Sequence, residues 1–416
     1  MKTPTTALLL AAALPTTVFG LGFRLTDQDT EATARGGAFV ATADNPSAIY
    51  YNPAGISQLS GTRSLMNAYT IGYGSSIDLS GPGGEYNSKW NPQVVPHSFY
   101  TLHPKDSPLT LGLGIYAPFG LGYEYDDKTP FRTLAKKGEI QYITVSPVAA
   151  WKFNETLAIA AGPTINYSRA FLSRGIVTPG DEFKFKGEGV SFGFVAGLLW
   201  KPAPQHSFGL AYHSATVTDY SGHSHVHIPS FVTPVTVAPG VTIPYTVPGV
   251  ESADDADASL QFPQTIQAGY SFRPTPDWNI EFDVEWTDWD SLNTVTLHQT
   301  KGGPIKIPFN YRSSFFYEVG ITKTFAHGLR LSGGYIYSEN SVPNESFSPG
   351  VPDSDRHVFS IGLGQTSGKY SWDIAYQYAY GPGRDVRNGP TAANALANGT
   401  YHFQSNAVSV SLGYEF

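Results

Sequence analysis

The last ten residues, AVSVSLGYEF (407–416), alternate strictly between large apolar side chains and small or polar ones. Because successive side chains of a β-strand point to opposite faces, this pattern predicts a strand with one apolar face and one polar face. The apolar face carries Val408, Val410, Leu412, Tyr414 and Phe416. A ten-residue strand of this kind is typical of a membrane barrel, whose exterior contacts lipid and whose lumen is wet.

The same alternation recurs along the chain, for example at IEFDVEWT (280–287) and SWDIAYQYAY (371–380). Runs of this type predict fourteen strands, at 62–78, 93–102, 109–119, 139–151, 156–174, 187–200, 206–221, 258–272, 278–290, 307–324, 328–338, 355–365, 369–380 and 403–416. The even-numbered strands end in short connections and the odd-numbered ones in longer connections, as expected for periplasmic turns and extracellular loops. We therefore predict an all-β fold, a transmembrane antiparallel β-barrel of about 14 strands with both termini in the periplasm.

The composition agrees with export to an outer membrane. The chain of 416 residues contains 25 Tyr, 25 Phe, 7 Trp and 43 Gly but no Cys. Lys2, followed by the apolar run 7–14 and then by small residues, is typical of a secretory signal, which we place at residues 1–20. No later apolar run is long enough to predict a spanning helix. The net charge of −8 lacks the basic footprint of a protein that binds nucleic acid.

The stretch ADNPSAIYYNPAG (43–55) belongs neither to the signal nor to the wall. Pro46 and Pro53 fix φ and lack an amide donor, so no central strand or helix interior runs through this stretch. It is also too apolar for a surface loop, and a barrel of this width needs filling if it is not an open pore. We therefore predict that residues 21–61 form an N-terminal hatch, which plugs the lumen of a barrel formed by residues 62–416.

Four segments, in this order, resemble the FadL-type family of outer-membrane transporters for hydrophobic compounds. They are Asn52-Pro53-Ala54-Gly55, YAPFGLGYEY (116–125), FRPTPDWNIEFDVEWTDWDS (272–291) and SENSVPNESFSPGVPDSDRH (338–357). The resemblance covers nearly the whole chain after the signal and implies a hatch whose NPA motif plugs the lumen. It also implies passive uptake, in which a hydrophobic molecule is captured outside and leaves sideways into the membrane. The terminal Phe416 is similar to the signal that such barrels offer to the barrel-insertion machinery.

The resemblance further implies a lateral exit at an inward kink of the third strand. Here that strand reads LTLGLGIYAPFG (109–120), and glycine and proline weaken ladder pairing. We expect the lateral opening at Gly112, Gly114, Pro118 and Gly120. The alternative is that the glycines only let aromatic neighbours pack in the wall.

A fatty-acid carboxylate in an apolar lumen needs a cation, and the resemblance implies basic residues on the fifth and tenth strands. The alternation places Arg174 on the lumenal face of the fifth strand, whereas Arg169 faces lipid or the rim. On the tenth strand it places Arg312 on one face with Phe316, which is expected to line an apolar channel. We therefore predict Arg174, Arg312 and Phe316 as ligand-binding residues. The alternative is that both arginines pair with lumenal acids and only hold the hatch.

The longest connection, at 222–257, contains His223, His225 and His227, followed by an uncharged run rich in Pro, Val and Thr. A polar strand end near lipopolysaccharide explains the histidines, and no metal site is predicted. Exposed apolar surface often marks binding, so we hypothesise that the apolar run helps form an outer groove that collects solute. The segment PDSDRH (352–357) is interpreted as a strand start with a local ion pair between Asp and Arg.

The sequence therefore predicts a monomeric outer-membrane transport protein that takes up hydrophobic compounds, with long-chain fatty acids as the leading class. The alternatives are a channel for uncharged aromatic or alkane hydrocarbons, a porin for polar solutes, and a surface adhesin. No GxSxG, HExxH or P-loop motif indicates an enzyme, and no cofactor is expected. The expected partners are hydrophobic small molecules, lipopolysaccharide with other outer-membrane lipid, and the insertion machinery.

Overall fold

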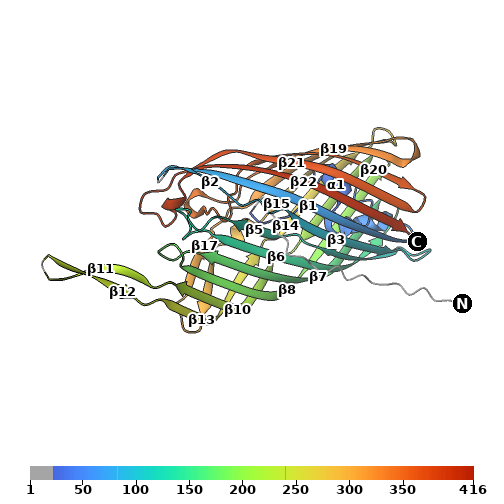
Figure 1. The fold of residues 1–416 in the computed structure, drawn as a ribbon. Coiled ribbons are helices and arrows are strands. Elements are labelled where there is room, and N and C mark those ends of the chain that lie inside the picture. Colours follow the sequence, from blue (N-terminus) through green and yellow to red (C-terminus); the bar gives the residue numbers. More distant parts are fainter. Residues whose placement is uncertain (1–21, 82, 239) are drawn as a thin grey trace.

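The wall of the barrel closes through the first and the last strand of the chain. In the computed structural model, β1 (Thr62–Leu79) pairs with β22 (Gly399–Glu415) in antiparallel register, from Arg63 opposite Glu415 to Leu79 opposite Gly399. The result is a closed fourteen-stranded antiparallel barrel, which confirms the predicted fold (Figure 1). The structure describes residues 22–81, 83–238 and 240–416. The predicted signal, residues 1–20, lies outside the described residues.

The wall strands follow one another in chain order, and three of them are interrupted. Between β1 and β22 they are β3 (Gln93–Leu102), β4 (Leu109–Tyr116) with β5 (Gly120–Glu124), β6 (Lys137–Lys152), β7 (Leu157–Arg174), β8 (Glu182–Ala203), β9 (His206–His213) with β10 (Thr216–Ile228), β13 (Val250–Phe262) with β14 (Thr265–Phe272), β15 (Trp278–Thr287), β18 (Ser314–Thr324), β19 (Leu329–Ser338), β20 (Arg356–Ser367) and β21 (Tyr370–Val386). The short turns lie at the end of the barrel that holds the C-terminus (Figure 1).

The remaining elements do not form part of the wall. The additional strands are β2 (Glu85–Asn87), β11 (Phe231–Ala238), β12 (Val241–Val247), β16 (Thr294–Gln299) and β17 (Ile305–Pro308). The helices are α1 (Thr30–Ala34), α2 (Ala48–Tyr51), η1 (Pro53–Gln58), η2 (Trp289–Ser291), η3 (Ala326–Gly328), η4 (Asn344–Ser346) and η5 (Ala395–Ala397). None of the helices in the described ranges is long and apolar enough to cross a membrane.

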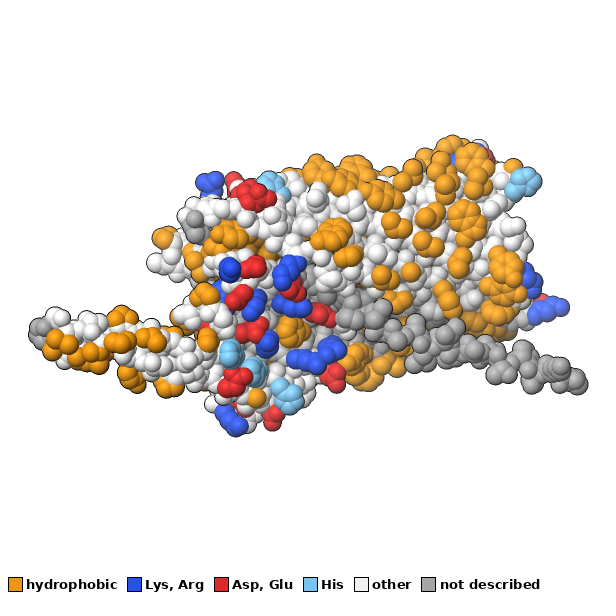
Figure 2. All heavy atoms as spheres, viewed as in Figure 1, with side chains coloured by type: hydrophobic (Ala, Val, Ile, Leu, Met, Phe, Trp, Pro, Cys, Tyr) orange, Lys and Arg blue, Asp and Glu red, His pale blue; other side chains and the backbone are white. Residues whose placement is uncertain are grey.

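The predicted alternation of side chains is confirmed in the wall. On β22, Val408, Val410 and Leu412 are exposed on the outer surface, whereas Ser409 and Ser411 are buried on the inside. Apolar side chains therefore cover much of the outer wall, and charged ones gather towards the end that carries the long loops (Figure 2). So much exposed apolar surface is unfavourable in water and is explained by contact with lipid.

Two regions differ from the predicted strands. The tenth wall strand, β18, begins at Ser314, because residues 305–308 instead pair with β16 in a loop outside the wall. The long connection at 222–257 is largely strand, since β10 and β13 continue their ladder as far as Ile228 opposite Val250. Beyond it, β11 and β12 form a separate hairpin that projects from the barrel (Figure 1). That this apolar hairpin collects solute stays a prediction.

The N-terminal segment, residues 22–61, lies inside the wall (Figure 1). Its helices α1 and α2 are largely buried, and its backbone passes very close to the wall at several glycines, among them Gly209 and Gly334. A Cβ atom built on Gly209 would overlap the carbonyl oxygen of Val40, and one on Gly334 would overlap the peptide between Arg35 and Gly36. Only residues without a side chain allow this approach. The small wall residues therefore shape the space that the N-terminal segment fills.

We expect Gly209→Ala to displace the N-terminal segment while leaving the wall intact. The added methyl group must push the Val40 backbone away, and overpacking of this kind costs about 1–3 kcal/mol. Urea unfolding in detergent micelles measures that cost, and limited proteolysis tests whether the segment becomes accessible. Gly74→Ala is the matched control, because its Cβ meets nothing within 4 Å. Equal stability and equal protease resistance of the two variants would contradict this packing.

Candidate functional site: the filled lumen and the break in its wall

The third wall strand is broken between β4 and β5. Tyr116 at the end of β4 pairs with Thr144, and Gly120 at the start of β5 pairs with Gln141. Three residues, 117–119, thus stand opposite two residues of β6, which is the arrangement of a β-bulge. Pro118 lies in the middle of the bulge and has no amide proton to donate. The strand therefore bends here and leaves its straight ladder.

The same strand also loses its partner on the other side. β3 pairs with β1 along its whole length, from Gln93 to Leu102, but on its other edge it pairs with β4 only over Ser98–Leu102. Its outer half, Gln93–His97, thus has a ladder with β1 alone. Among the described residues no ladder joins that outer half to β5, which pairs with β6. At the outer end the gap is bridged by Lys89, whose amide donates to the carbonyl of Glu124 at 2.8 Å and whose ammonium contacts the Glu124 carboxylate at 2.6 Å. The wall is thus interrupted between β3 and β5.

The N-terminal segment supplies the backbone partners that the broken strand lacks. The amide of Leu25 donates to the carbonyl of Pro118 at 2.8 Å, and the amide of Gly120 donates to the carbonyl of Phe23 at 2.9 Å. The side chain of Gln28 donates to the carbonyl of Ala117 and accepts from its amide, at 2.9 and 3.0 Å. Unpaired peptide groups are very costly at membrane depth. The break is therefore closed from inside the lumen.

Three acidic residues on the lumenal face of β15 hold the N-terminal segment. Glu285 accepts from Arg24 through both carboxylate oxygens, at 2.5 and 2.6 Å, and Glu281 accepts from Arg35 at 2.8 Å. Between them, one oxygen of Asp283 accepts from two successive backbone amides, those of residues 39 and 40, at 2.8 Å each. All three carboxylates are fully buried, where an unpaired charge is strongly unfavourable. The pairs therefore define the position of the segment.

A fourth buried carboxylate, Glu318 on β18, belongs to the same region. Both of its oxygens lack a hydrogen-bond partner in the described structure, and a Cβ on Gly37 would meet them closely. The cation that attracts it electrostatically is Arg24, which already pairs with Glu285. In this region more carboxylates than guanidinium groups are therefore buried. Arg24 is the cation that stabilises the charge of both Glu285 and Glu318.

The predicted hatch motif fixes the segment to a second part of the wall. The amide group of Asn52 donates to the carbonyls of Val40 and Leu198, at 2.8 and 3.0 Å, and its oxygen caps η1 by accepting from Ala54. Pro53 occupies the first position of that helix, where no amide proton is needed. Gly55 lies so close to the Ala43 carbonyl that a side chain would overlap it. Asn52 therefore connects the segment internally and to β8.

Only part of the predicted opening lies at the break. Pro118 is inside it, and Gly120 is the first residue after it. Gly112 and Gly114, however, pair regularly with both β3 and β6, so the expectation that they weaken the ladder is wrong. A Cβ on either glycine would approach the side chain of Ile49. These two glycines instead make room for the N-terminal segment.

The structure separates the three predicted ligand residues. Arg174 lies half-buried at the outer end of β7, with its guanidinium 5.6 Å from the ring of Phe183, and no acid of the described chain lies within ion-pair distance. Phe316 is fully buried on the lumenal face of β18. Arg312 is exposed and precedes β18, so its predicted place on the lumenal face is wrong. The reason is that the strand begins seven residues later than the alternation predicts.

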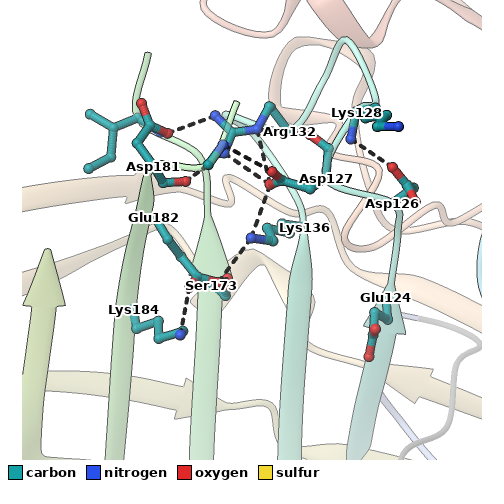
Figure 3. A network of polar contacts seen from close by, with 12 residues as sticks. Glu124, Asp126, Asp127, Lys128, Arg132, Lys136, Ser173, Asp181, Glu182 and Lys184 are labelled. Carbon is teal, nitrogen blue, oxygen red and sulfur yellow. Dashed lines mark hydrogen bonds and ion pairs between the residues drawn. The ribbon is translucent and has the colours of Figure 1, made fainter. Parts of the chain in front are cut away.

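An ionic network orders the loops outside the break (Figure 3). Arg132 contacts Asp181 at 2.7 Å and Asp127 at 3.0 Å, and Lys136 contacts Asp127 and Glu182 at 3.0 and 3.1 Å. Burial opposes ionisation of Asp181, but hydrogen bonds from backbone amides and from Arg132 outweigh it and hold the pKa of that carboxyl below its usual range. The loop that follows β5 is therefore tied to the hairpin of β7 and β8.

The histidines of the long connection lie on the ladder between β10 and β13. His225 and His227 both contact the carboxylate of Glu251, at 2.9 and 2.5 Å, and His223 contacts Asp255 at 3.0 Å. In the described ranges, no group of three or more potential ligands is placed to hold a metal ion. The histidines thus form polar cross-strand pairs at the outer surface.

Aromatic rings fill the outer half of the lumen next to the break. The ring centroid of Phe23 lies 4.8 Å from that of Trp289, 5.7 Å from that of Phe262 and 6.2 Å from that of Phe119. Phe119 belongs to the break itself and packs in turn on Tyr142, with centroids 5.3 Å apart. Apolar side chains thus line the lumen where the N-terminal segment meets the break.

Comparisons with known proteins agree with this arrangement. A family model described as outer membrane protein transport protein (OMPP1/FadL/TodX) matches residues 11–416. The long-chain fatty acid transport protein of Escherichia coli O6:H1 is 23% identical, covering 99% of this chain and 97% of its own. Outer membrane protein P1 of Haemophilus influenzae Rd is also 23% identical, with 99% and 98% covered.

Solved structures show the same fold. A Pseudomonas aeruginosa FadL homologue has a TM-score of 0.80 and 20% identity, over 95% of this chain and 100% of its own. The Pseudomonas putida toluene transporter TodX has a TM-score of 0.72 and 15% identity, over 97% of this chain and 100% of its own. Proteins named for fatty acids and for toluene thus share the architecture of this chain.

We expect Arg24→Met to destabilise the filled lumen, because it leaves Glu285 buried without its cation. Breaking a buried ion pair costs about 3–5 kcal/mol, whereas removing both partners costs much less. The double variant Arg24→Met with Glu285→Gln should therefore recover much of the stability lost by the single variant. Urea unfolding measures the energies, and single-channel conductance in planar bilayers reports loosening of the segment. Additive effects of the two changes would contradict a coupled pair.

Proposed function

Because the chain belongs to the OMPP1/FadL/TodX family of outer membrane transport proteins, we propose that it takes up long-chain fatty acids by passive diffusion and lateral release. The observation that carries the proposal is the break between β3 and β5, where the wall strand is paired from inside by residues 23–28. A wall closed by its own ladders offers no sideways path. A wall closed by a segment in the lumen opens when that segment moves.

The route follows from the solubility of the solute. An apolar molecule crosses the polar lipopolysaccharide layer poorly, and its release into the aqueous periplasm is unfavourable. A solute that enters the outer lumen meets the aromatic side chains around Phe23 and Phe119. When the N-terminal segment shifts, the solute leaves through the break into the hydrocarbon core of the membrane. The segment thus acts as the hatch, with Asn52 as one of its fixed points.

The leading substrate class rests on a cation in the lumen. Arg174 is half-buried and lacks an acidic partner in the described chain, so a carboxylate entering from outside meets a free positive charge. The second candidate is a channel for uncharged hydrocarbons, which the aromatic lining favours. In that case Arg174 has a structural role only. The filled lumen argues against a porin for polar solutes, and no catalytic step is proposed.

The remaining partners are inferred from the location of the protein in the outer membrane. Phe416, exposed at the end of β22, is proposed to address the barrel to its insertion machinery. The closed wall needs no second copy to complete it, so we propose a monomer in contact with lipopolysaccharide and other outer-membrane lipid.

Uptake of labelled oleate and labelled toluene tests the substrate class. The host cells lack their own transporter and express this chain in the outer membrane. We expect saturable uptake of oleate. Uptake of toluene alone would favour the hydrocarbon channel, and uptake of neither would overturn the proposed transport.

Deletion of Pro118 tests the lateral exit. Removing one residue from the bulge leaves two residues opposite two, so the third strand can pair continuously with β6. We expect uptake to fall at least about tenfold while the barrel still folds and reaches the outer membrane. Deletion of Gly303, which lies in an outer loop with nothing within 4 Å of a built Cβ, is the matched control. Undiminished uptake by the Pro118 deletion would contradict lateral release at this place.

A further inference from the structure

A small cavity separates the N-terminal segment from the wall formed by β1 and β19–β22. Its volume is about 50 Å³, which is room for a few water molecules or for a carboxylate group but not for a long chain. Two arginines line it: Arg24 of the segment and Arg356 at the start of β20. Its apolar wall is formed by Leu25, Ile71, Ile336, Val358, Ala379 and Phe403.

Arg356 is a buried cation with little to bind. It is only 3% exposed, its guanidinium lies 3.7 Å above the ring of Phe403, and its Nε has no hydrogen-bond partner in the described structure. Within the described residues it makes one hydrogen bond, from Nη2 to Oδ1 of Asp353, which is also an ion pair, at 3.3 Å. A guanidinium carries five N–H donors, and buried donors are nearly always paired. Most of the binding capacity of Arg356 is therefore unused.

The partner that Arg356 has is engaged elsewhere. The other oxygen of Asp353 accepts from the amide and the hydroxyl of Ser341, at 2.8 and 3.0 Å, which fixes the carboxylate to the loop. The arginines around it are better satisfied. Arg24 is bound by both oxygens of Glu285, and Arg384 donates four hydrogen bonds to loop residues. Arg356 thus differs from the arginines that only hold the structure together.

We propose that this cavity binds the carboxylate of an amphiphilic solute and that Arg356 is its anchor. The planar fork of a guanidinium matches a carboxylate, and the apolar side chains beside it suit the first carbons of an alkyl chain. Asp27 also lines the cavity, but its Oδ1 accepts from Gln377 at 2.9 Å and is turned to that amide. The remainder of the chain would occupy space that opens when the N-terminal segment moves. The proposal rests on the proposed transport of fatty acids.

The test compares oleate with oleyl alcohol, which has the same chain and no charge. Binding of each to the purified protein in detergent micelles is measured for the natural chain, for Arg356→Met and for Arg356→Lys. We expect the natural chain to prefer oleate, and Arg356→Met to weaken oleate binding about tenfold or more with little change for the alcohol. Arg356→Lys, which keeps the charge but not the fork, should fall between them.

Arg169→Met is the matched control, because the alternation of β7 places that arginine away from the buried lumenal face, and Arg174→Met tests the second lumenal arginine as the anchor. A loss of the preference for oleate in Arg174→Met but not in Arg356→Met would overturn the proposal, as would an equal loss of both ligands in Arg356→Met. If Arg356→Met does not fold, as judged by circular dichroism, the same comparison is made with Arg356→Lys. A natural chain that binds both ligands equally overturns this inference alone. One that binds neither overturns the proposed function.

Discussion

Everything in this structure depends on one constraint: the peptide groups of a membrane wall must find hydrogen-bond partners inside the protein. A closed barrel normally meets it with strand ladders alone. Here the bulge at residues 117–119 interrupts the ladder, and the partners come from Phe23, Leu25 and Gln28 of a segment that belongs to no strand of the wall. The wall and the contents of the lumen are therefore one hydrogen-bonded system. Movement of the segment leaves the break unpaired, which is why we connect the two in transport.

Buried charge determines where the segment lies. Glu281, Asp283 and Glu285 follow one another on the lumenal face of a single strand, so the pleat aims all three at the same side. They meet two arginines and the four backbone amides of residues 39–42 of the segment. In a dry interior such pairs specify position more than they add stability, because the cost of desolvation offsets much of the attraction. The arrangement is compatible with the proposed hatch, which holds one position at rest and moves during transport.

The lumen presents both aromatic and positively charged side chains to a solute. The aromatic side chains around Phe23 offer an apolar solute a place without hydrogen-bond demands. Arg174 has no acidic partner within ion-pair distance in the described chain, and Arg356 has one long contact, with Asp353. We propose these two cations as the groups that distinguish a carboxylate from a plain hydrocarbon. Relatives named for fatty acids and for toluene share the fold. The fold that these proteins share therefore does not by itself select between the two kinds of solute.

The sequence by itself determined the barrel, because the alternation of side chains, as in 407–416, follows from the backbone geometry of each strand and needs no distant contact. The prolines of 43–55 likewise excluded a wall strand there, since proline acts through its own backbone. Only the tertiary structure decided which residues meet in the lumen. Arg312 is not on the lumenal face, because residues 305–308 form β17 and pair with β16 outside the wall. Gly112 and Gly114 make room for Ile49, which is far from them in the sequence. Such pairings depend on distances that alternation does not encode, so the incomplete hydrogen bonding of Arg356 was apparent only in three dimensions.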